Sequence, residues 1–241
     1  MDKRRFKTAF ILGAGLGTRL RPLTDSCPKP LLPVGGRPII TYAMDHLLGI
    51  GVDRFIVNTH HCPHTYKSVF PDALWRGTPI LFRHEPVLLD TGGGLKNIED
   101  LLGEDEIIIC YNGDIITNLP LGPLLSALDR DGVEATLILR SRGPLLNVNI
   151  TETGEICDLR HVLGRKGAQS CLFTGIYAVR TSFLAQLEAG KIESVIDAFL
   201  RRIADRPGTI RGVIVDQGQW DDIGSVEIYG RVKAGEWVES P

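Results

Sequence analysis

The sequence predicts an α/β fold built on a largely parallel sheet. Apolar runs of strand length alternate with segments whose apolar residues recur at helical spacing, which is typical of a parallel sheet flanked by helices. The chain has 241 residues, of which 43% are hydrophobic and 23% charged, so it can bury a sizeable core. We expect a single domain over residues 1–241, which is favoured over two.

The first half of the chain supplies four predicted strands and three predicted helices. Pro38 and Pro63 each suit the first position of a helix, where a backbone N–H has no partner, and Thr91 can cap a third helix. Gly49 and Gly103 mark helix ends. The predicted strands cover residues 9–12, 55–58, 80–83 and 107–111, and the predicted helices cover residues 38–48, 63–70 and 92–102.

The second half has a more mixed pattern. Thr153-Gly154 separates two short apolar runs, which predicts a hairpin. An amphipathic run over residues 195–203 predicts a helix. The remaining predicted helices cover residues 121–129 and 226–232, and the predicted strands cover residues 135–139, 148–150, 156–159, 172–179 and 213–215.

Composition excludes several classes of partner. Lys and Arg number 27 and Asp and Glu 29, a net charge of −2, and aromatic residues are only 7%, so we expect no binding to nucleic acid. Five cysteines form no C-x-x-C pair, which favours a reduced, cytoplasmic protein. No apolar run approaches the roughly 18 residues of a membrane span, and no cleavage pattern follows the basic start, so we expect no membrane segment or signal peptide.

A glycine-rich loop follows the first predicted strand. Gly13, Gly15 and Gly17 let backbone N–H groups approach an anion without interference from a Cβ atom, which favours a phosphate cradle. A dinucleotide fingerprint would need glycine at Thr18 and an acidic residue at Asn58, and no Walker Gly-Lys-Ser/Thr follows, so both classes are disfavoured. A simple surface turn is the alternative.

Three cations follow on the same loop, Arg19, Arg21 and Lys29. Arginine can fork onto phosphate oxygens and lysine acts as a point charge, so the loop can hold a triphosphate and stabilise charge as a phosphoryl bond breaks. The alternative is a set of solvated surface cations.

Asp114 is a candidate metal ligand because it follows the strand at 107–111, and ligands gather at the carboxyl ends of parallel strands. A carboxylate beside phosphate needs a counter-charge, and Mg²⁺ held by one or two carboxylates and phosphate oxygens is the expected one. The segment Trp220-Asp221-Asp222-Ile223-Gly224-Ser225 is a second candidate. A turn residue and a helix N-cap, respectively, are the alternatives.

The run Gly13-x-Gly15-x-Gly17-Thr18-Arg19-Leu20-Arg21-Pro22-Leu23-Thr24, continued by Pro28-Lys29-Pro30-Leu31-Leu32-Pro33-Val34, resembles the signature of sugar-1-phosphate nucleotidyltransferases, the NDP-sugar pyrophosphorylases. The resemblance implies a Rossmann-like wound, mixed, mostly parallel sheet flanked by helices. It also implies that Asp222, not Asp221, joins Asp114 in holding Mg²⁺, and that Arg19 and Lys29 act on the phosphates with them. The implied nucleotide-binding residues of the loop are Leu12, Gly13, Ala14, Gly15, Gly17, Thr18, Arg19 and Lys29.

Base and sugar selection are assigned through the same resemblance. Glu85 and the Asp90-Thr91-Gly92-Gly93-Gly94 segment resemble the base-reading part of the family, in a form most like N-acetylmuramate-1-phosphate uridylyltransferases. Mannose-1-phosphate guanylyltransferases more often carry Leu-Gly-Thr-Ala-Gly there. The nucleotide-binding set thus adds Glu85, Thr91 and Gly92, for which a helix N-cap with flexible glycines is the alternative. The expected sugar-side set is Asn112, Asn147, Thr174 and Gly175, and packing or hairpin roles are the alternative for Asn147, Thr174 and Gly175.

We therefore expect Mg²⁺-dependent transfer of a nucleotide from a nucleoside triphosphate to a sugar-1-phosphate. The best match is uridylyl transfer to an amino-sugar phosphate such as N-acetylmuramate-1-phosphate, with guanylyl transfer to mannose- or heptose-1-phosphate as the alternative. A catalytically inactive regulatory subunit is the alternative from another class. Residues 8–114 are expected to bind the nucleotide and residues 115–235 the sugar phosphate, in a free-standing monomer or homodimer.

Overall fold

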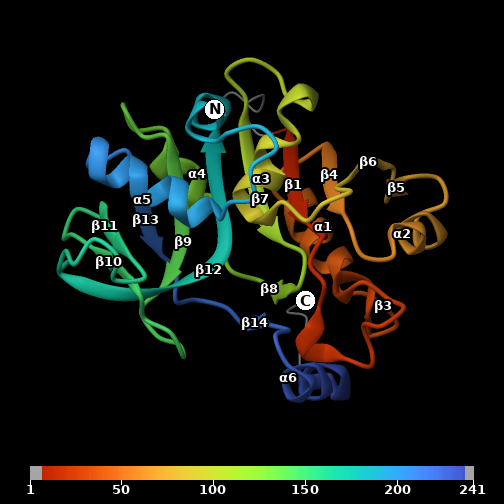
Figure 1. Ribbon diagram of the computed structural model, residues 1–241. Helices are drawn as coiled ribbons and strands as arrows, with labels where there is room; N and C mark the ends of the chain where they lie inside the picture. Colours follow the sequence, from red (N-terminus) through yellow and green to blue (C-terminus); the bar gives the residue numbers. More distant parts are fainter. Residues whose placement is uncertain (1–6, 237–241) are drawn as a thin grey trace. The chain divides into compact units, whose positions relative to one another are not determined.

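The computed structural model describes residues 7–236, and the chain divides into two compact units (Figure 1). The first unit comprises Met1–Leu88, Tyr111–Asn118 and Gly218–Pro241, and the second comprises Leu89–Cys110 and Leu119–Gln217. Each unit is therefore assembled from separate stretches of chain. The expected division of nucleotide and sugar phosphate between residues 8–114 and 115–235 stays a prediction.

A mainly parallel sheet forms the centre of the first unit. Strand β1 pairs in parallel with β4, and β4 with β6, while β5 adds an antiparallel edge. The last two residues of β7 belong to this unit and extend the order to β7-β1-β4-β6-β5. The strands are β1 (Thr8–Leu12), β4 (Arg54–Thr59), β5 (Leu74–Trp75), β6 (Thr78–His84) and β7 (Ile107–Asn112), with helices α1 (Ile40–Leu48) and α2 (Pro63–Val69).

The buried centre of this sheet explains why its strands were predictable. Ala9, Phe10 and Ile11 of β1 are all inaccessible to solvent, and so are the central residues of β4. Consecutive burial means that both faces of these strands are covered, so they read as continuous apolar runs rather than as alternating ones. The four strands predicted in the first half of the chain are confirmed to within two residues at each end.

Two short antiparallel ladders complete the first unit, and the sequence did not predict them. They are β2 (Pro33–Val34) with β3 (Arg37–Pro38), and β8 (Ile115–Thr117) with β14 (Trp220–Asp222). Pro38 therefore does not start a helix as expected: it pairs with Pro33, and its carbonyl accepts a hydrogen bond from Thr41 Oγ1 at 2.7 Å. Helix α1 begins at Ile40 instead.

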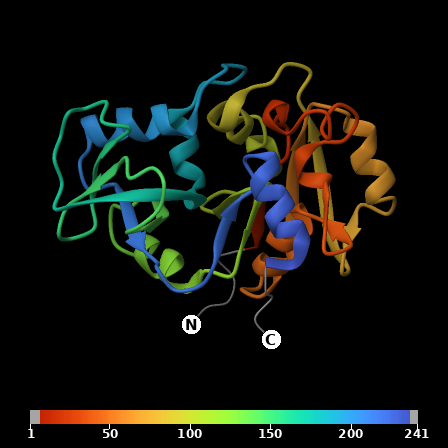
Figure 2. The same ribbon diagram turned by 90° about the horizontal axis from the view of Figure 1, so that it is seen from below.

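Helix α6 (Val226–Arg231) packs against the segment that carries these ladders. The Tyr229 hydroxyl donates to the Pro33 carbonyl at 2.9 Å, and both views show the blue C-terminal helix beside the red and orange N-terminal segment (Figures 1 and 2). Residues from the two ends of the chain therefore share one structural region.

The second unit has mixed topology, as expected. The strand order is β11-β10-β12-β7, and β9 pairs with both β12 and β13. The strands are β9 (Ala135–Arg140), β10 (Val148–Ile150), β11 (Ile156–Leu159), β12 (Gln169–Arg180) and β13 (Ile210–Ile214), with helices α3 (Asp90–Lys96), α4 (Gly122–Leu128) and α5 (Val195–Asp205). The predicted hairpin at Thr153-Gly154 is confirmed as the β10–β11 pair.

Two expectations in this unit were wrong in detail. The helix expected over residues 92–102 ends at Lys96 and is followed by a separate 3-10 turn, Glu99–Leu101. The late strand starts at Ile210 rather than at residue 213, because Arg211 and Gly212 interrupt the apolar pattern while their backbones still pair with β9.

The predicted class, a mixed and mostly parallel sheet flanked by helices, is confirmed. Across residues 7–236, every helix is too short or too polar to cross a bilayer.

Candidate active site

Gly13 fixes the start of the glycine-rich loop in a buried polar network. Its N–H donates to Asn58 Oδ1 at 2.7 Å, and its carbonyl accepts from the Tyr66 hydroxyl at 2.9 Å. A Cβ atom at this position would lie 2.6 Å from that hydroxyl and 2.7 Å from the Asn58 carbonyl oxygen. Glycine is therefore required here by close packing.

Asn58 connects this loop to Glu85. The Asn58 amide Nδ2 donates to Glu85 Oε1 at 2.8 Å, and His60 Nδ1 donates to the Glu85 carbonyl at 2.7 Å. Glu85 has no exposed surface, so here it supports Asn58 from within the core. Its expected contact with a nucleobase stays a prediction. In the sequence, Asn58 stands out only as the position where a dinucleotide fingerprint would have an acidic residue. A polar residue at the end of a buried strand is nevertheless a pattern that indicates a functional position.

The loop is anchored again at Gly17 and left open between the two anchors. Gly17 has a φ of 62°, which only glycine adopts readily, and its carbonyl accepts from Thr24 Oγ1 at 2.8 Å. His61 Nε2 donates to the Thr24 carbonyl at 2.7 Å. A Cβ atom on Gly15 would meet no atom within 4 Å, so the middle of the loop is open for a ligand to approach.

Lys29 brings the loop to the first candidate aspartate. Its side chain is only 8% exposed, and Nζ bonds to Asp114 Oδ2 and lies 3.8 Å from Asp222 Oδ1. A buried ammonium between two carboxylates is a charged cluster, so the surface-cation alternative is excluded for Lys29. Arg21 does match that alternative, because it pairs at 3.4 Å with Asp25, and both side chains are well exposed.

The β8–β14 ladder explains how Asp222 reaches Asp114 across more than a hundred residues of chain. Asp222 is paired with Ile115, and the Ile223 N–H donates to the Asp114 carbonyl at 3.0 Å. Asp114 itself lies in the turn that joins β7 to β8. On the other side of that turn, the Gly113 N–H donates to the Leu12 carbonyl at 3.0 Å, which ties the aspartate to the end of β1.

The helix-cap alternative for Asp222 is excluded. Ser225 caps α6, and its hydroxyl accepts from the Ile228 N–H at 3.3 Å. The neighbouring Asp221 pairs with Arg231 of α6 and takes no part in the cluster. The two adjacent aspartates therefore have different surroundings in the structure. The metal-binding role that the resemblance gives to Asp222 stays a prediction.

The surroundings of Asp222 disfavour the ionised form of its carboxyl group. Burial, followed by repulsion from Asp114, raises the pKa of Asp222, while Lys29 and Arg19 partly oppose the rise. A Cβ on Gly224 would lie 3.3 Å from an Arg19 guanidinium nitrogen and 3.5 Å from Asp222 Oδ1, so Arg19 lies along the same edge of the site.

The residues fit a hard divalent cation. Asp222 Oδ1 is buried and has no hydrogen-bond partner, which is costly unless something else satisfies it. Within residues 7–236, no group of three or more His, Cys, Asp or Glu side chains forms a metal site. Two carboxylates are nevertheless what Mg²⁺ uses when phosphate oxygens and waters complete its coordination.

A hydrophobic cluster in the first unit includes residues that adjoin these charged side chains in sequence. Its members come from the segment between the glycine-rich loop and α1, from α1 itself, from β8, from the residue after β14, from α6 and from the residue that follows α6. They are Leu20, Leu32, Val34, Ile39, Tyr42, Ile116, Ile223, Tyr229 and Val232. Ile223 directly follows Asp222, so burial of Ile223 helps to orient Asp222.

Thr91 and Gly92 lie in the second unit and are engaged in packing. The Thr91 hydroxyl lies within α3 and accepts from the Val195 N–H at the start of α5, at 2.9 Å, so Thr91 is not the cap of its own helix. The Gly92 N–H donates to the Glu193 carbonyl at 2.9 Å, and a Cβ on Gly92 would lie 2.9 Å from that oxygen. Their contact with a nucleotide stays a prediction.

The expected sugar-side residues divide between the units. Asn112 ends β7 in the first unit, and Asn147 precedes β10 in the second, with its carbonyl accepting from Arg160 N at 2.7 Å. Thr174 is buried and donates to the Ile138 carbonyl at 2.8 Å, beside Gly175, whose φ of 81° marks a bulge in β12. The sugar-binding role of these four residues stays a prediction.

Both the sequence and the fold match known proteins. A family model described as nucleotidyl transferase matches residues 8–235. The mannose-1-phosphate guanylyltransferase of Mycobacterium tuberculosis is 30% identical over 229 residues, covering 94% of this chain and 63% of that protein. The N-acetylmuramate alpha-1-phosphate uridylyltransferase of Caulobacter vibrioides is 29% identical over 229 residues, covering 90% of this chain and 92% of that protein.

Solved structures agree on the fold. HddC from Yersinia pseudotuberculosis, in its complex with GMP-PN, matches with a TM-score of 0.76 at 21% identity, over 96% of this chain and 100% of that one. This chain spans less than two thirds of the mycobacterial relative, and nearly the full length of the Caulobacter one. The resemblance first seen in the glycine-rich loop is thus confirmed at the level of the family.

Proposed function

Because the chain belongs to the nucleotidyl transferase family, we propose that it joins a nucleoside monophosphate to a sugar-1-phosphate and releases pyrophosphate. The observation that carries the proposal is the convergence of Lys29, Asp114 and Asp222, with Arg19 on the same edge, beside a glycine loop held open at Gly15. A binding module that only recognised a nucleotide would have little use for two carboxylates facing one buried ammonium.

The chemistry needs no nucleophile from the protein. An oxygen of the sugar phosphate attacks the α-phosphorus, the bond from that phosphorus to the bridging oxygen of the β-phosphate breaks, and pyrophosphate leaves with the electron pair. The attacking oxygen is already anionic at neutral pH, so positioning and charge neutralisation supply the catalysis. Arg19 and Lys29 carry the positive charge that would hold the leaving pyrophosphate.

Asp114 and Asp222 would hold Mg²⁺, which neutralises phosphate charge and orients phosphate oxygens when it is bound. The orphaned Asp222 Oδ1 supports this role, because a cation would satisfy a buried oxygen that has no hydrogen-bond partner in the protein. Lys29 already bonds to Asp114, so metal binding would compete with that ion pair and free the ammonium for phosphate.

Uridylyl transfer to an amino-sugar phosphate of the N-acetylmuramate type is our first choice of reaction. It is supported by the Thr91-Gly92-Gly93-Gly94 form and by the name of the Caulobacter relative, which this chain matches over most of both lengths. Guanylyl transfer to a mannose-type phosphate is the second choice, favoured by the name of the mycobacterial relative. A cytoplasmic location is part of this proposal, supported by five cysteines that form no C-x-x-C pair.

The test is pyrophosphate release with Mg²⁺ over a grid of four nucleoside triphosphates and five sugar phosphates. The sugars are the 1-phosphates of N-acetylmuramate, N-acetylglucosamine, mannose, heptose and glucose. We expect release that requires one triphosphate and one sugar phosphate together, that is lost in Asp114→Asn, and that persists in Asp221→Asn, the matched control whose carboxylate pairs with Arg231. Nucleotide binding without release anywhere on the grid would favour the inactive regulatory subunit.

A further inference from the structure

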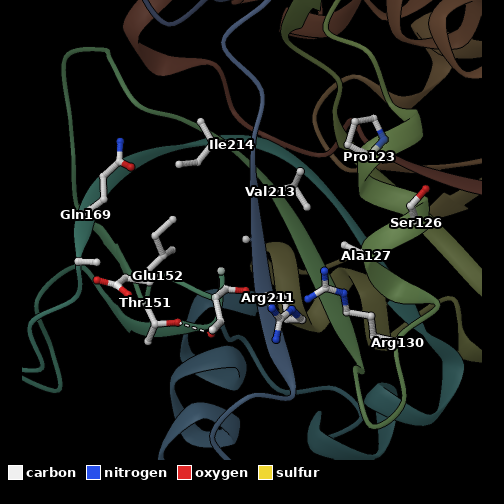
Figure 3. Close-up of a pocket in the computed structure, with 15 residues that line it drawn as sticks. Pro123, Ser126, Ala127, Arg130, Thr151, Glu152, Gln169, Arg211, Val213 and Ile214 are labelled. Atoms are coloured by element: carbon white, nitrogen blue, oxygen red, sulfur yellow. Dashed lines mark hydrogen bonds between the residues drawn. The ribbon is translucent and has the colours of Figure 1, made fainter.

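A pocket opens in the second unit among residues that none of the proposed substrate contacts uses (Figure 3). Its volume is about 700 Å³, within the range of small-molecule sites. Helix α4 and the turn after it form one wall, the turn of the β10–β11 hairpin and the start of β12 form the other, and β13 runs between them.

Two arginines lie at one end of this pocket. The guanidinium of Arg130 makes no hydrogen bond or ion pair with any residue in the described part of the chain, and its side chain is exposed. The side chain of Arg211 is only 10% exposed. It is held in place by the hairpin, because Nη2 donates to the Thr153 carbonyl and Nη1 lies 3.6 Å from Glu155 Oε1. Figure 3 shows both guanidinium groups at the same end.

Two guanidinium groups that line one pocket can together bind an anion. A guanidinium offers up to five N–H donors in a planar fork that matches phosphate or carboxylate, and Arg211 uses only part of its set. Arg211 is the preorganised member, while Arg130 is free to close over a ligand. The anion would therefore be bound at this end.

Polar groups of a different kind lie across the pocket. Gln169 and Glu152 make no side-chain hydrogen bond within the described residues, and Thr151 Oγ1 lies 2.9 Å from Thr153 Oγ1. Figure 3 shows Gln169, Glu152 and Thr151 on the side opposite Arg130. An amide, a carboxylate and a hydroxyl bind hydroxyl groups well, whereas Glu152 would repel a second anion.

The floor between the two ends is apolar and includes a strand edge. Val213 and Ile214 of β13 line it, and Ile214 is 37% exposed. Val215 N donates to the β9 residue Leu139, and Gly212 N donates on the opposite side, to Gly154. Alternation along the strand therefore turns the N–H and C=O of Ile214 away from β9, toward the pocket side.

From this arrangement we propose that the pocket binds a phosphorylated sugar at a site separate from the proposed transferase centre. The phosphate would bond to Arg130 and Arg211, the face of the sugar ring would cover Val213 and Ile214, and the hydroxyls would bond to Gln169 and Glu152. Arg130 lies across the apolar floor from Gln169 and Glu152, while Arg211 is held by Thr153 and Glu155 of the hairpin. This arrangement matches a molecule with one anionic end and one hydroxylated end. No covalent step is involved.

Glucose 6-phosphate is the probe, because its phosphate is not at the anomeric carbon and it cannot serve as a sugar-1-phosphate substrate. Isothermal titration calorimetry would follow its binding to the intact chain and to Arg130→Ala, with inorganic phosphate and glucose as separate titrants. Arg142→Ala is the matched control, an exposed arginine of the same unit that bonds to the Asp216 carbonyl and does not line the pocket.

We expect saturable binding of glucose 6-phosphate that weakens about tenfold or more in Arg130→Ala, as expected when a charged hydrogen bond is lost, and that is unchanged in Arg142→Ala. Glu152→Gln should weaken glucose 6-phosphate but not inorganic phosphate. Hydrogen exchange should show the Ile214 amide protected by the ligand. Equal affinity of Arg130→Ala and the unmodified chain, or absence of saturable binding, would overturn the proposal. Equal affinity for phosphate and glucose 6-phosphate would overturn the part that concerns the sugar.

Discussion

Replacing Asn58 with alanine should disturb the position of the glycine-rich loop, because Asn58 holds Gly13 by a buried hydrogen bond. The change removes the acceptor of the Gly13 N–H, at 2.7 Å, and the donor to Glu85 Oε1, at 2.8 Å, in a region without solvent. Each buried polar group that loses its partner costs about 1–3 kcal/mol, so the variant should lose about 2–6 kcal/mol of unfolding free energy. In a chain of this size that lowers Tm by at least about 4 °C.

Stability alone does not identify a positioning role, so the assay pairs a thermal melt with steady-state kinetics. Asn149→Ala is the matched control: Asn149 is 7% exposed, donates to the Arg165 carbonyl at 2.9 Å, accepts from Ser170 Oγ at 2.7 Å, and lies in the second unit. Both variants should melt earlier. Only Asn58→Ala should lower kcat/KM for the triphosphate, by about ten- to a hundredfold, because small misplacements of binding groups are costly in rate.

Asn58→Asp separates the two hydrogen bonds. Its first oxygen can still accept from Gly13, but its second would face the Glu85 carboxylate where the amide donor was, and two such carboxylates cannot both ionise without a large cost. This variant should therefore recover stability as the pH falls. Kinetics of Asn58→Ala within twofold of the unmodified enzyme, measured well below its Tm, would refute the positioning argument.

Substitutions at Gly17, Asp222 and Ser225 test the same region in three further ways. Gly17→Ala should lower the unfolding free energy by about 1–3 kcal/mol, measured by urea denaturation, because φ is 62° and the new Cβ would lie 2.9 Å from Thr24 Cγ2; an unchanged midpoint would contradict the strain. The raised pKa of Asp222 means that the folded chain holds a proton that the unfolded chain has lost, in the window from the ordinary carboxyl pKa up to the raised one. Stability should therefore fall as pH rises through that window, and Asp222→Asn without Mg²⁺ should melt higher at neutral pH while losing activity; a lower Tm would contradict this. Ser225→Ala should lower the unfolding free energy by about 1 kcal/mol through loss of the α6 cap, and should lower Mg²⁺ affinity because that cap follows Asp222 closely in sequence. Ser194→Ala, at the cap of α5, is the control: it should also melt earlier, but with unchanged Mg²⁺ affinity. Equal Mg²⁺ affinity in the two variants would contradict this.

The sequence contained enough information for the parallel core and for the charged loop. Buried strands such as Thr8–Leu12 and Ile107–Asn112 are continuous apolar runs, and the glycines and Lys29 stand close together along the chain. These features depend on local pattern, which a sequence displays directly.

The contacts that assemble the site could not be predicted from pattern alone. The β8–β14 ladder has three pairs, too short for a periodic signal, yet it is what brings Asp222 beside Asp114. The family resemblance, rather than periodicity, distinguished Asp222 from Asp221. Likewise, nothing local in the sequence indicates that Asn58 bonds to Gly13, because that contact depends on the parallel register of β1 and β4. The pocket lined by Arg130 and Arg211 likewise depends on a long-range pairing, that of β13 with β9.

In the proposed reaction the nucleotide passes directly from one substrate to the other, at a site that supplies charge and no nucleophile. The decisive assay is exchange of labelled pyrophosphate into the triphosphate, measured with Mg²⁺ and the triphosphate that the grid identifies. We predict exchange when the matching sugar phosphate is present, no exchange when it is absent, and none in Asp114→Asn under either condition. Exchange without the sugar phosphate would reveal a covalent nucleotidyl-enzyme and rule out direct transfer.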